Sequence, residues 1–427
     1  MPAPARKLGE LPAEVLELVT KEMDIETILS FRSSSRYAAQ CSHWHFNRNY
    51  RNTIVTDFSR QDFDRIERRL KDEPNCISYV GTLAVTGKPA DTTRPLQTQS
   101  LKMGAGFKWE RAWDYGLLDL THENVTAWRN LLSRFTNLQH FRINTDLDLT
   151  AGIRWDLGSD SQLSYSDVWL IAMPLIKEGP FAVTSLDLFG PNFYRGFMGS
   201  GQTITDDDER PILDALFPAS GPKADWPHLE SITLRFGMAP TYTRFKTVIS
   251  HAPKLKKVSL LGILGRPHLA DIASCADVFK LEELHLAGMG FDPISENDLR
   301  RALRAVRGTL KTLSLAEVSV ADWVDLLRFL RDTGFPALRE FTIDKVAKEW
   351  NISELHWPLH AANKRLITAP SGGKVTCKLS VFNGATYCHM VTYSGTGMNS
   401  VLEQLAANAV LIHGNGAQVV AEETYTF

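Results

Sequence analysis

The sequence has little of what marks secreted or membrane-spanning proteins. Its five cysteines form no Cys-X-X-Cys pair and are odd in number, which is typical of a reducing compartment. Residues 1–10, MPAPARKLGE, contain no apolar stretch like that of a signal peptide. The most apolar window, Val168 to Ile176, has nine residues with a proline inside and is too short to cross a bilayer. We therefore expect a cytoplasmic or nuclear protein, or one found in both, without a membrane partner.

An excess of charge of either sign is also missing. The chain has 47 Lys and Arg residues against 49 Asp and Glu residues, so no electrostatic footprint for nucleic acid is visible. Hydrophobic residues make up 44% of the 427 residues, which is enough for a large core. The length allows two or three domains, or one small domain followed by a repeat array.

Motifs for enzymatic chemistry are absent as well. Gly395-Thr-Gly397 lacks the third glycine of a dinucleotide fingerprint, and no phosphate-binding Gly-X-X-X-X-Gly-Lys loop occurs. The acidic run 206–209 fits the start of a helix better than a cation site. His43 and His45 have a spacing that places them on opposite sides of a helix. We expect no catalytic residues, no metal site, no cofactor and no enzymatic activity.

What is present first is a short helical block at residues 8–48. Leu11-Pro12 opens it, because proline suits the first helical position, and Asp24 is a suitable N-cap for a second helix. Apolar residues recur at helical spacing over residues 12–23, and a third, more polar helix is predicted from about Ser33 to Trp44. About 40 residues are close to the size at which a chain needs a metal, disulfides or a partner to fold. The block is therefore expected to dock onto something.

This block resembles an F-box without any gap. The residues that carry the resemblance are Leu11, Pro12, Glu14, Val15, Leu16, Val19, Met23, Asp24, Ile28, Leu29, Phe31, Arg32, Ser35 and Arg36. Two residues of the third helix depart from the family pattern: Ser34, where an aliphatic residue is usual, and Ala38, where an aromatic one is usual. The resemblance implies docking on a Skp-type adaptor and, through it, on a cullin-RING ubiquitin ligase. The expected adaptor contacts are Leu11, Pro12, Val15, Leu16, Val19, Ile28, Leu29 and Phe31. An ordinary amphipathic helix pair is the alternative.

A phrase of the form L-X-X-L-X-L, in which each L stands for any large apolar residue, occurs eight times after the helical block. The copies begin at Val80, Leu138, Val183, Leu229, Leu255, Leu281, Leu310 and Leu338. The last four intervals between copies are 26, 26, 29 and 28 residues, in or beside the range of leucine-rich repeats. Most of the connections also contain an amphipathic helix, for example around Trp128, Leu303 and Leu327.

Each unit, one helix and one short strand, cannot bury its apolar face alone and must stack on its neighbours. The expected fold is therefore α/β: a small all-α F-box followed by a leucine-rich-repeat-like solenoid with parallel strands. This solenoid is similar to the irregular repeats that often follow an F-box. The expected segments are the F-box at 8–48, a connector with a first helix at 49–79, the solenoid at 80–346 and a C-terminal cap at 347–427.

Two long insertions interrupt the early repeats, at residues 87–121 and 189–226. Their aromatic residues can contact a partner or pack back on the repeats, and both interpretations stay open: Trp109, Trp113, Tyr115, Phe193, Tyr194 and Phe197. In the cap, residues 374–393 alternate around Asn383-Gly384, which predicts a hairpin. A helix is predicted at 398–412, with a final strand after it.

Residues between the apolar positions of each strand point to the open face of a solenoid sheet. The candidate substrate contacts on that face are Arg142, Asp187, Phe189, Arg235, Leu261 and His285. The expected function is that of a substrate receptor of a Skp–cullin–F-box ubiquitin ligase, which binds an unknown protein substrate. One alternative is a leucine-rich-repeat interaction scaffold without a ligase role. Another is an enzyme with its site in the last 80 residues.

Overall fold

The computed structural model describes residues 12–89, 100–111, 118–143, 154–155, 161–163, 165–177, 181–189, 226–236, 242–262, 266–288, 295–344, 347–348, 353–358, 373–382, 385–413 and 418–426. The chain has a mixed α/β fold with a mostly parallel, open sheet. It divides into two compact units. Unit 1 comprises residues 1–90, 101–146 and 156–183, and unit 2 comprises residues 91–100, 147–155 and 184–427.

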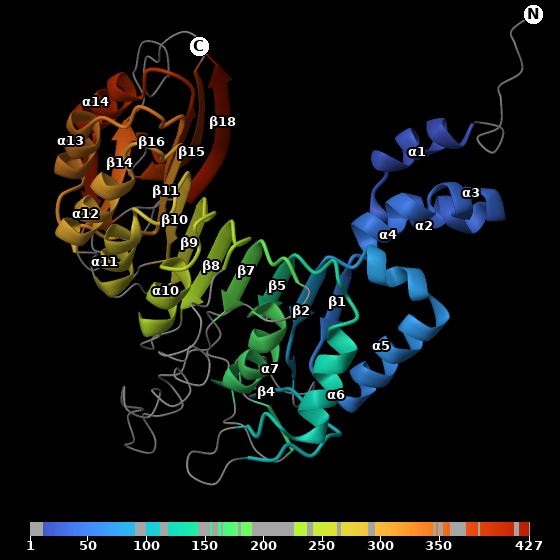
Figure 1. Cartoon of the computed structure of the whole chain (residues 1–427). Helices are drawn as coiled ribbons and strands as arrows, with labels where there is room; N and C mark the ends of the chain where they lie inside the picture. The colour runs from blue at the N-terminus through green and yellow to red at the C-terminus, as the bar shows by residue number, and fades with distance from the viewer. Residues whose placement is uncertain are drawn as a thin grey trace, which may run out of the picture. The chain divides into compact units, whose positions relative to one another are not determined.

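Unit 1 begins with four short helices that pack against one another (Figure 1). They are α1 (Ala13–Lys21), α2 (Ile25–Ser34), α3 (Arg36–Cys41) and α4 (His43–Tyr50). The prediction of a single third helix over 33–44 is wrong, because this region is divided at Ser35 and at Ser42. The Ser42 hydroxyl, which is buried, donates to the carbonyl oxygen of Ala38 at 2.6 Å. Such a local side-chain bond competes with the helical ladder.

A short parallel sheet follows in the same unit. Its strands are β1 (Thr53–Thr56), β2 (Thr82–Val85) and β5 (His140–Ile143), with β2 between the other two. The other elements described are α5 (Arg60–Asp72), the 3-10 turn η2 (Pro74–Ser78), β3 (Lys88–Pro89), β4 (Ser100–Lys102), α6 (Glu123–Leu132) and α7 (Tyr165–Lys177). In the segment expected as a connector with a first helix, 49–79, the helix is present as α5, and the residues before it also form β1, which was not predicted.

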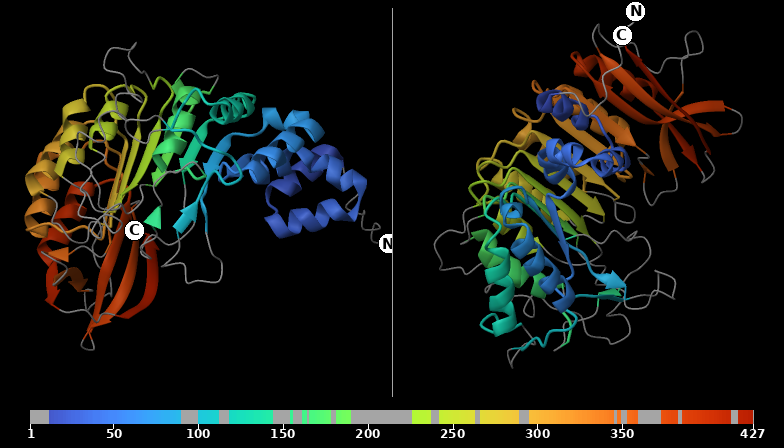
Figure 2. Two further views of the ribbon diagram at one scale, coloured as in Figure 1. Left: turned by 90° about the horizontal axis from the view of Figure 1, so that it is seen from below. Right: turned by 90° about the vertical axis from the view of Figure 1, so that its right-hand side faces the viewer.

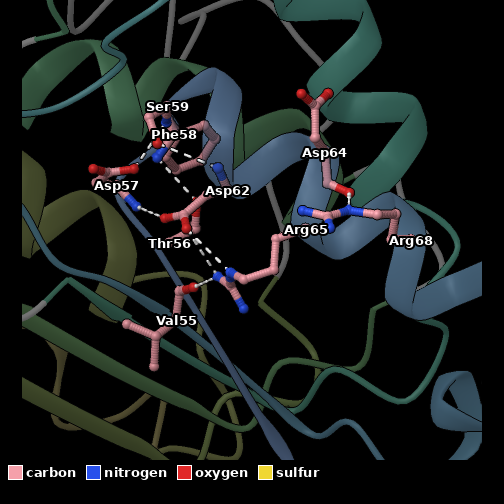
Figure 3. Close-up of polar contacts among 9 residues, drawn as sticks. All are labelled: Val55, Thr56, Asp57, Phe58, Ser59, Asp62, Asp64, Arg65 and Arg68. Atoms are coloured by element: carbon pink, nitrogen blue, oxygen red, sulfur yellow. Dashed lines mark hydrogen bonds and ion pairs between the residues drawn. The ribbon is translucent and has the colours of Figure 1, made fainter.

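The turn from β1 to α5 is fixed by polar side chains (Figure 3). Asp62 accepts a hydrogen bond from the backbone N–H of Asp57 at 2.9 Å and lies 3.1 Å from the guanidinium of Arg65. Ser59 caps α5 by accepting from the N–H of Asp62 at 3.3 Å. Phe58 between them is fully buried with a φ of 61°, in the left-handed region that non-glycine residues rarely adopt. These contacts hold a strained turn in place.

Aromatic side chains form the core above this turn. Phe58 lies 4.7 Å from Trp128 of α6, between ring centroids, and Phe107 lies 5.4 Å from Trp109. Trp109 is fully buried and donates its indole N–H to the carbonyl oxygen of Gly104 at 2.8 Å. Of the two interpretations of the first insertion, packing back on the fold therefore holds for Trp109. The other five aromatic residues for which both interpretations were left open lie outside the described residues: Trp113, Tyr115, Phe193, Tyr194 and Phe197.

Unit 2 repeats one strand and one helix. Its parallel strands are β7 (Ser185–Phe189), β8 (Ser231–Phe236), β9 (Lys257–Gly262), β10 (Glu283–Ala287), β11 (Thr312–Ala316) and β12 (Glu340–Asp344). The helices are α10 (Tyr242–Ile249), α11 (Arg266–Cys275), α12 (Glu296–Val306) and α13 (Trp323–Thr333), which lie along one face of these strands (Figure 2). A two-residue strand, β6 (Arg154–Trp155), also belongs to this unit.

All eight predicted strand phrases are strands in the structure. In unit 2 they pair in one register, so that equivalent apolar residues stand side by side, as Leu284 does between Val258 and Leu313. These three side chains are fully buried against the helices. Backbone bonds before each strand repeat as well: Glu282 N–H donates to Lys256, and Lys311 N–H donates to Glu282, each at 2.7 Å. The repeat predicted from the apolar spacing is confirmed at this level.

The C-terminal residues continue the sheet of unit 2. The predicted hairpin is confirmed as β15 (Lys374–Phe382) and β16 (Ala385–Ser394), and β16 pairs antiparallel with β12, the last repeat strand. Around them lie β13 (Ala347–Lys348), β14 (Ser353–Pro358), α14 (Met398–Asn408), β17 (Val410–His413) and β18 (Gln418–Thr426). The helix predicted over 398–412 therefore ends early, at Asn408, because Val410 to His413 pair with β14 instead.

Candidate functional site

Local hydrogen bonds set the ends of the N-terminal helices. Asp24 caps α2 by accepting from the N–H of Thr27 at 2.8 Å, as its position in the sequence predicts, and these bonds from Thr27 lower the pKa of the carboxyl. Ser35 caps α3 by accepting from the N–H of Ala38 at 3.0 Å. Pro12 immediately precedes α1 and its carbonyl accepts the first helical bonds. Two caps and a proline thus define a compact block of short helices.

A small core holds these helices together. Leu16 of α1, Ile28 of α2 and Ala38 of α3 are buried. Arg32 at the end of α2 donates to the carbonyl oxygen of Ala39 at 2.9 Å, and its guanidinium lies 4.3 Å from the ring centroid of Phe46. Burial lowers the pKa of Arg32. One guanidinium therefore ties α2 to both α3 and α4.

Outside this core the helices expose large apolar side chains. Nine such residues are exposed in the described part of the chain, and six of them lie between residues 15 and 37. The six define what we call the N-terminal apolar surface, and 36–63% of their surface is exposed: Val15, Leu18, Val19, Ile25, Leu29 and Tyr37. Single exposed apolar residues are ordinary, but such a concentration on three short helices makes this surface a candidate for interaction with another protein.

The exposed residues follow helical spacing. Val15, Leu18 and Val19 share one side of α1, and Ile25 and Leu29 are one turn apart on α2. The surface therefore consists of two apolar stripes, one per helix, with Tyr37 at the start of α3. It can bind an apolar ridge or helix of another protein by burying apolar area.

The eight expected adaptor contacts differ in how exposed their side chains are. Pro12, Val15, Val19 and Leu29 are exposed, and Phe31 is half-buried. The remaining two described residues, Leu16 and Ile28, are fully buried and stabilise the block, so neither is available for contact. Leu11 lies outside the described residues. Sequence reasoning left out Leu18, Ile25 and Tyr37, although Leu18 was visible from its spacing to Val15.

A second candidate surface is the open face of the repeat sheet. In unit 2, Asp187 stands in register with Thr233, Ser259 and His285 on successive strands, and the expected contacts Asp187, Leu261 and His285 are half-buried there. The register also places Phe189 beside Arg235 and Arg235 beside Leu261. The side chains of Phe189 and Arg235 lie outside the described part. Arg142 is exposed on β5 of unit 1.

The centre of this face carries a charged cluster. Lys257 Nζ lies 2.8 Å from Glu283 Oε2, and His285 Nε2 lies 3.4 Å from the same oxygen. The hydrogen bond from Lys257 lowers the pKa of Glu283, so its carboxylate is ionised at neutral pH. Burial lowers the pKa of His285, although Glu283 opposes this, so the imidazole is neutral there. The cluster is a set of fixed polar groups that can recognise a ligand.

Hydroxyl groups flank this cluster along the same row of the sheet. Ser314 and Thr342 follow His285 in register, and Thr342 Oγ1 lies 3.1 Å from Thr392 Oγ1 on β16. These short side chains extend only a little way from the sheet, and each hydroxyl can donate and accept a hydrogen bond. The open face is therefore suited to polar contacts with a protein surface or peptide.

Other sequence features have structural explanations. Arg300 of α12 is paired with Glu296 of the same helix and with Asp325 of α13. A Cβ atom at Gly395 would lie 2.7 Å from the Cα of Gly373, so this glycine permits a close approach of two chain segments. The acidic run 206–209 lies outside the described part. Within that part, no three His, Cys, Asp or Glu side chains are grouped as metal ligands.

Comparison with known proteins gives no family. No protein-family model matches the sequence, and no curated protein matches it either. Among the helices that the structure describes, none combines the length and apolar character that a membrane span requires.

Proposed function

We propose that this protein is a substrate receptor whose N-terminal helices act as an F-box and bind a Skp-type adaptor of a cullin-RING ubiquitin ligase. The observation that carries the proposal is the N-terminal apolar surface, on a block of helices whose own core is small. The sequence resemblance over residues 11–36 gives that surface its expected occupant. The repeats, which resemble leucine-rich repeats, then bind a protein substrate through the open face of their sheet.

In this function the chain performs no bond chemistry. It holds a substrate near a charged conjugating enzyme that other subunits carry, and so raises the effective concentration of the substrate's lysines. The fixed polar cluster around Glu283 and the hydroxyl row support specific contacts with the substrate on the repeat sheet. A repeat scaffold without a ligase role would share the sheet but would not need the exposed stripes on α1 and α2.

Co-expression with a Skp adaptor tests the proposal. Leu18→Asp plus Leu29→Asp introduces charge on both stripes without touching the buried Leu16 and Ile28. Since residues at the centre of an interface contribute about 2 kcal/mol or more each, adaptor recovery should fall by at least about tenfold.

The matched control is Val278→Asp in unit 2, where a valine has 39% of its surface exposed, similar to Val15. This control should recover the adaptor as the wild type does. Leu18→Ser plus Leu29→Ser provides a milder version in case the aspartates disturb folding, which circular dichroism will show. Wild-type recovery with a folded stripe variant, or no adaptor with the wild type, would remove the ligase assignment and leave the scaffold.

A further inference from the structure

Two rows of opposite charge lie on the open face of the unit 2 sheet, where the last repeat strand meets the C-terminal hairpin. Glu340 and Asp344 belong to β12, whereas Lys374 and Lys378 belong to β15, and β16 lies between these strands. Through β16 the register aligns Glu340 with Lys374 and Asp344 with Lys378. We call the two carboxylates the acidic row and the two ammonium groups the basic row.

All four side chains point to the open face. They alternate along their strands with buried residues, and such neighbours lie on opposite faces of a sheet: Phe341, Ile343, Val375 and Cys377. Since strands are about 4.8 Å apart and residues of one strand about 3.3 Å, the rows lie about 10 Å apart and the members of each row about 13 Å apart. Thr392 of β16 lies between the rows, with its Oγ1 3.1 Å from that of Thr342. The rows therefore border a strip of the sheet that carries hydroxyl groups.

The members of both rows have no ion-pair partners in the part of the chain that the structure describes. Lys257 and Glu283, which stand on adjacent strands of the same face, form an ion pair at 2.8 Å, but none spans the two strand spacings between the rows. Glu340 accepts one hydrogen bond, from the Thr312 hydroxyl at 3.3 Å. Asp344 Oδ1 is shielded from solvent and accepts none within that part. A shielded acceptor without a partner is costly, so a ligand that donates to it is bound favourably.

We infer that the two rows bind an extended segment of the protein substrate that contains two basic residues four positions apart, each followed by an acidic residue. Successive side chains of an extended segment point to opposite sides, and residues four apart share a side at about 13 Å from each other. When the segment lies over β16, its basic side chains meet the acidic row and its acidic side chains meet the basic row. The hydroxyls of Thr342 and Thr392 can bond to its backbone.

Charge complementarity decides against a segment of one sign. Such a segment would place like charges against one of the two rows, and this juxtaposition opposes binding. The inference rests on the proposed substrate-receptor function, because it names the class of substrate that the open face binds. Its test uses peptides instead of the adaptor, so that the two proposals can fail separately.

Fluorescence anisotropy with the full chain tests the spacing. The probe is a fluorescein-labelled GTKETTKETG peptide. The control peptide GTKKTTEETG has the same composition and net charge, but its lysines point to opposite sides, so one lysine and one glutamate face a row of their own sign. The first peptide should bind with a Kd at least about fivefold lower than the control peptide. Equal Kd values, or no binding of the first peptide, would contradict the inference.

Exchanging the charges tests the four residues. Glu340→Lys plus Asp344→Lys should remove the preference between the peptides, and so should Lys374→Glu plus Lys378→Glu. With all four substitutions the rows are again opposite in charge but exchanged, and the first peptide fits them after a half-turn about the sheet normal. A preference of about threefold or more should therefore return. A variant with all four substitutions that is folded by circular dichroism but regains no preference would overturn the inference.

Two controls separate the rows from other sources of charge. Asp277→Lys plus Glu403→Lys changes the net charge as much as the substitutions in the acidic row do, at exposed positions elsewhere in unit 2, and should keep the preference. Glu422→Gln changes the residue of β18 that is in register with Lys378. It should also keep the preference, because the segment lies over β16, on the other side of Lys378. Loss of the preference in either control would assign the binding to net charge or to β18 and not to the two rows.

Adaptor recovery is measured on the same variants and should equal that of the wild type, because the N-terminal apolar surface is unchanged in them. Equal binding of the two peptides with normal adaptor recovery removes the inference and keeps the ligase role. A clear peptide preference without adaptor recovery removes the ligase role and leaves a scaffold that binds such a segment. A dimer in sedimentation velocity that either pair of substitutions dissociates would assign the rows to a second copy of the chain instead.

Discussion

Helices α1 and α13 carry comparable apolar stripes but bury them to different extents. The stripe of α13 consists of five large apolar side chains, and all five are buried: Trp323, Leu326, Leu327, Phe329 and Leu330. On α1, Leu16 is buried, whereas Val15, Leu18 and Val19 are exposed. The reason is the extent of contact, because α13 packs closely on α14 and lies along the strands of the sheet, while α1 makes only small contacts with α3 and α4. An apolar stripe therefore predicts which side of a helix is apolar, and the surrounding elements decide whether that side is buried.

The test with the largest expected effect replaces one leucine in each region by alanine. Leu313→Ala on β11 should lower the local free energy of unfolding of the repeats by about 2–5 kcal/mol, because the fully buried side chain leaves a cavity. Leu18→Ala on α1 should change it by less than about 0.5 kcal/mol, because that side chain is already exposed. Hydrogen exchange measured segment by segment gives both values.

The repeat variant has Leu261→Ala as its control, since Leu261 is only half-buried on the open face of β9, which is separated from β11 by β10. A loss as large for Leu18→Ala as for Leu313→Ala would mean that α1 is covered by this chain itself. The N-terminal apolar surface would then not exist in solution.

The sequence allowed much of the repeat unit to be predicted. Strands with the apolar spacing of Leu284 and Leu286, and helices with that of Leu326 and Leu330, were predicted because neighbouring repeats bury the same positions in each unit. Strand β1 was missed, since its four residues, TIVT, are too few to show alternation. The end of α14 was misplaced, because Val410 continues an apolar pattern that its pairing with β14 overrides.

The division of the N-terminal residues into core and surface was beyond the sequence. Leu16 and Ile28 are as apolar as Leu18 and Leu29, and all four fit a helical stripe. Only the packing of α1 on α3 and α4, and of α2 on α3, decides which side chains face inward. This packing depends on contacts between helices such as that of Arg32 with Phe46. The resemblance to a family predicts what the helical block is, but it does not predict which of its apolar residues are buried and which are exposed.

A smaller test compares two helix caps of the same chemistry. Ser35 caps α3 in the N-terminal block, and Ser295 caps α12 in the repeats by accepting from the N–H of Asp298 at 3.4 Å. Replacing either by alanine should lower the local free energy of unfolding by about 1 kcal/mol, because the lost bond is local in both. Both substitutions should therefore raise hydrogen exchange of the capped helix by a similar factor, about fivefold. The protection that remains after the substitution should be lower in α1 to α4 than in α12, because the N-terminal block has the smaller core. Equal remaining protection would show that the two regions are equally stable and contradict the comparison. Ser35→Asp retains a cap and is the control.

The smallest effect concerns two aspartates with opposite pKa shifts. Hydrogen bonds from Thr27 lower the pKa of Asp24 in α2, whereas burial raises the pKa of Asp271 in α11, whose Oδ2 has no hydrogen-bond partner within the described residues. Asp24 therefore stabilises its region above the ordinary carboxyl pKa of 3.8, and this contribution is lost as the pH falls through its lowered value. For Asp271 the dependence of stability on pH has the opposite sign. Its region is most stable below 3.8, and stability declines as the pH rises from there through the raised pKa.

Hydrogen exchange corrected for intrinsic rates, measured between pH 3 and pH 7, separates the two. Protection in α2 should increase with pH and protection in α11 should decrease. Asp271→Asn should remove the decrease and stabilise α11 at pH 7 but not at pH 3, where the wild-type carboxyl is also neutral. Asp24→Asn keeps a capping oxygen and should flatten the α2 profile without abolishing the helix. If α11 instead gains protection with rising pH, Asp271 has a charge partner that offsets its burial, and the contrast between an exposed, locally capped helix and a buried repeat helix does not extend to their carboxylates.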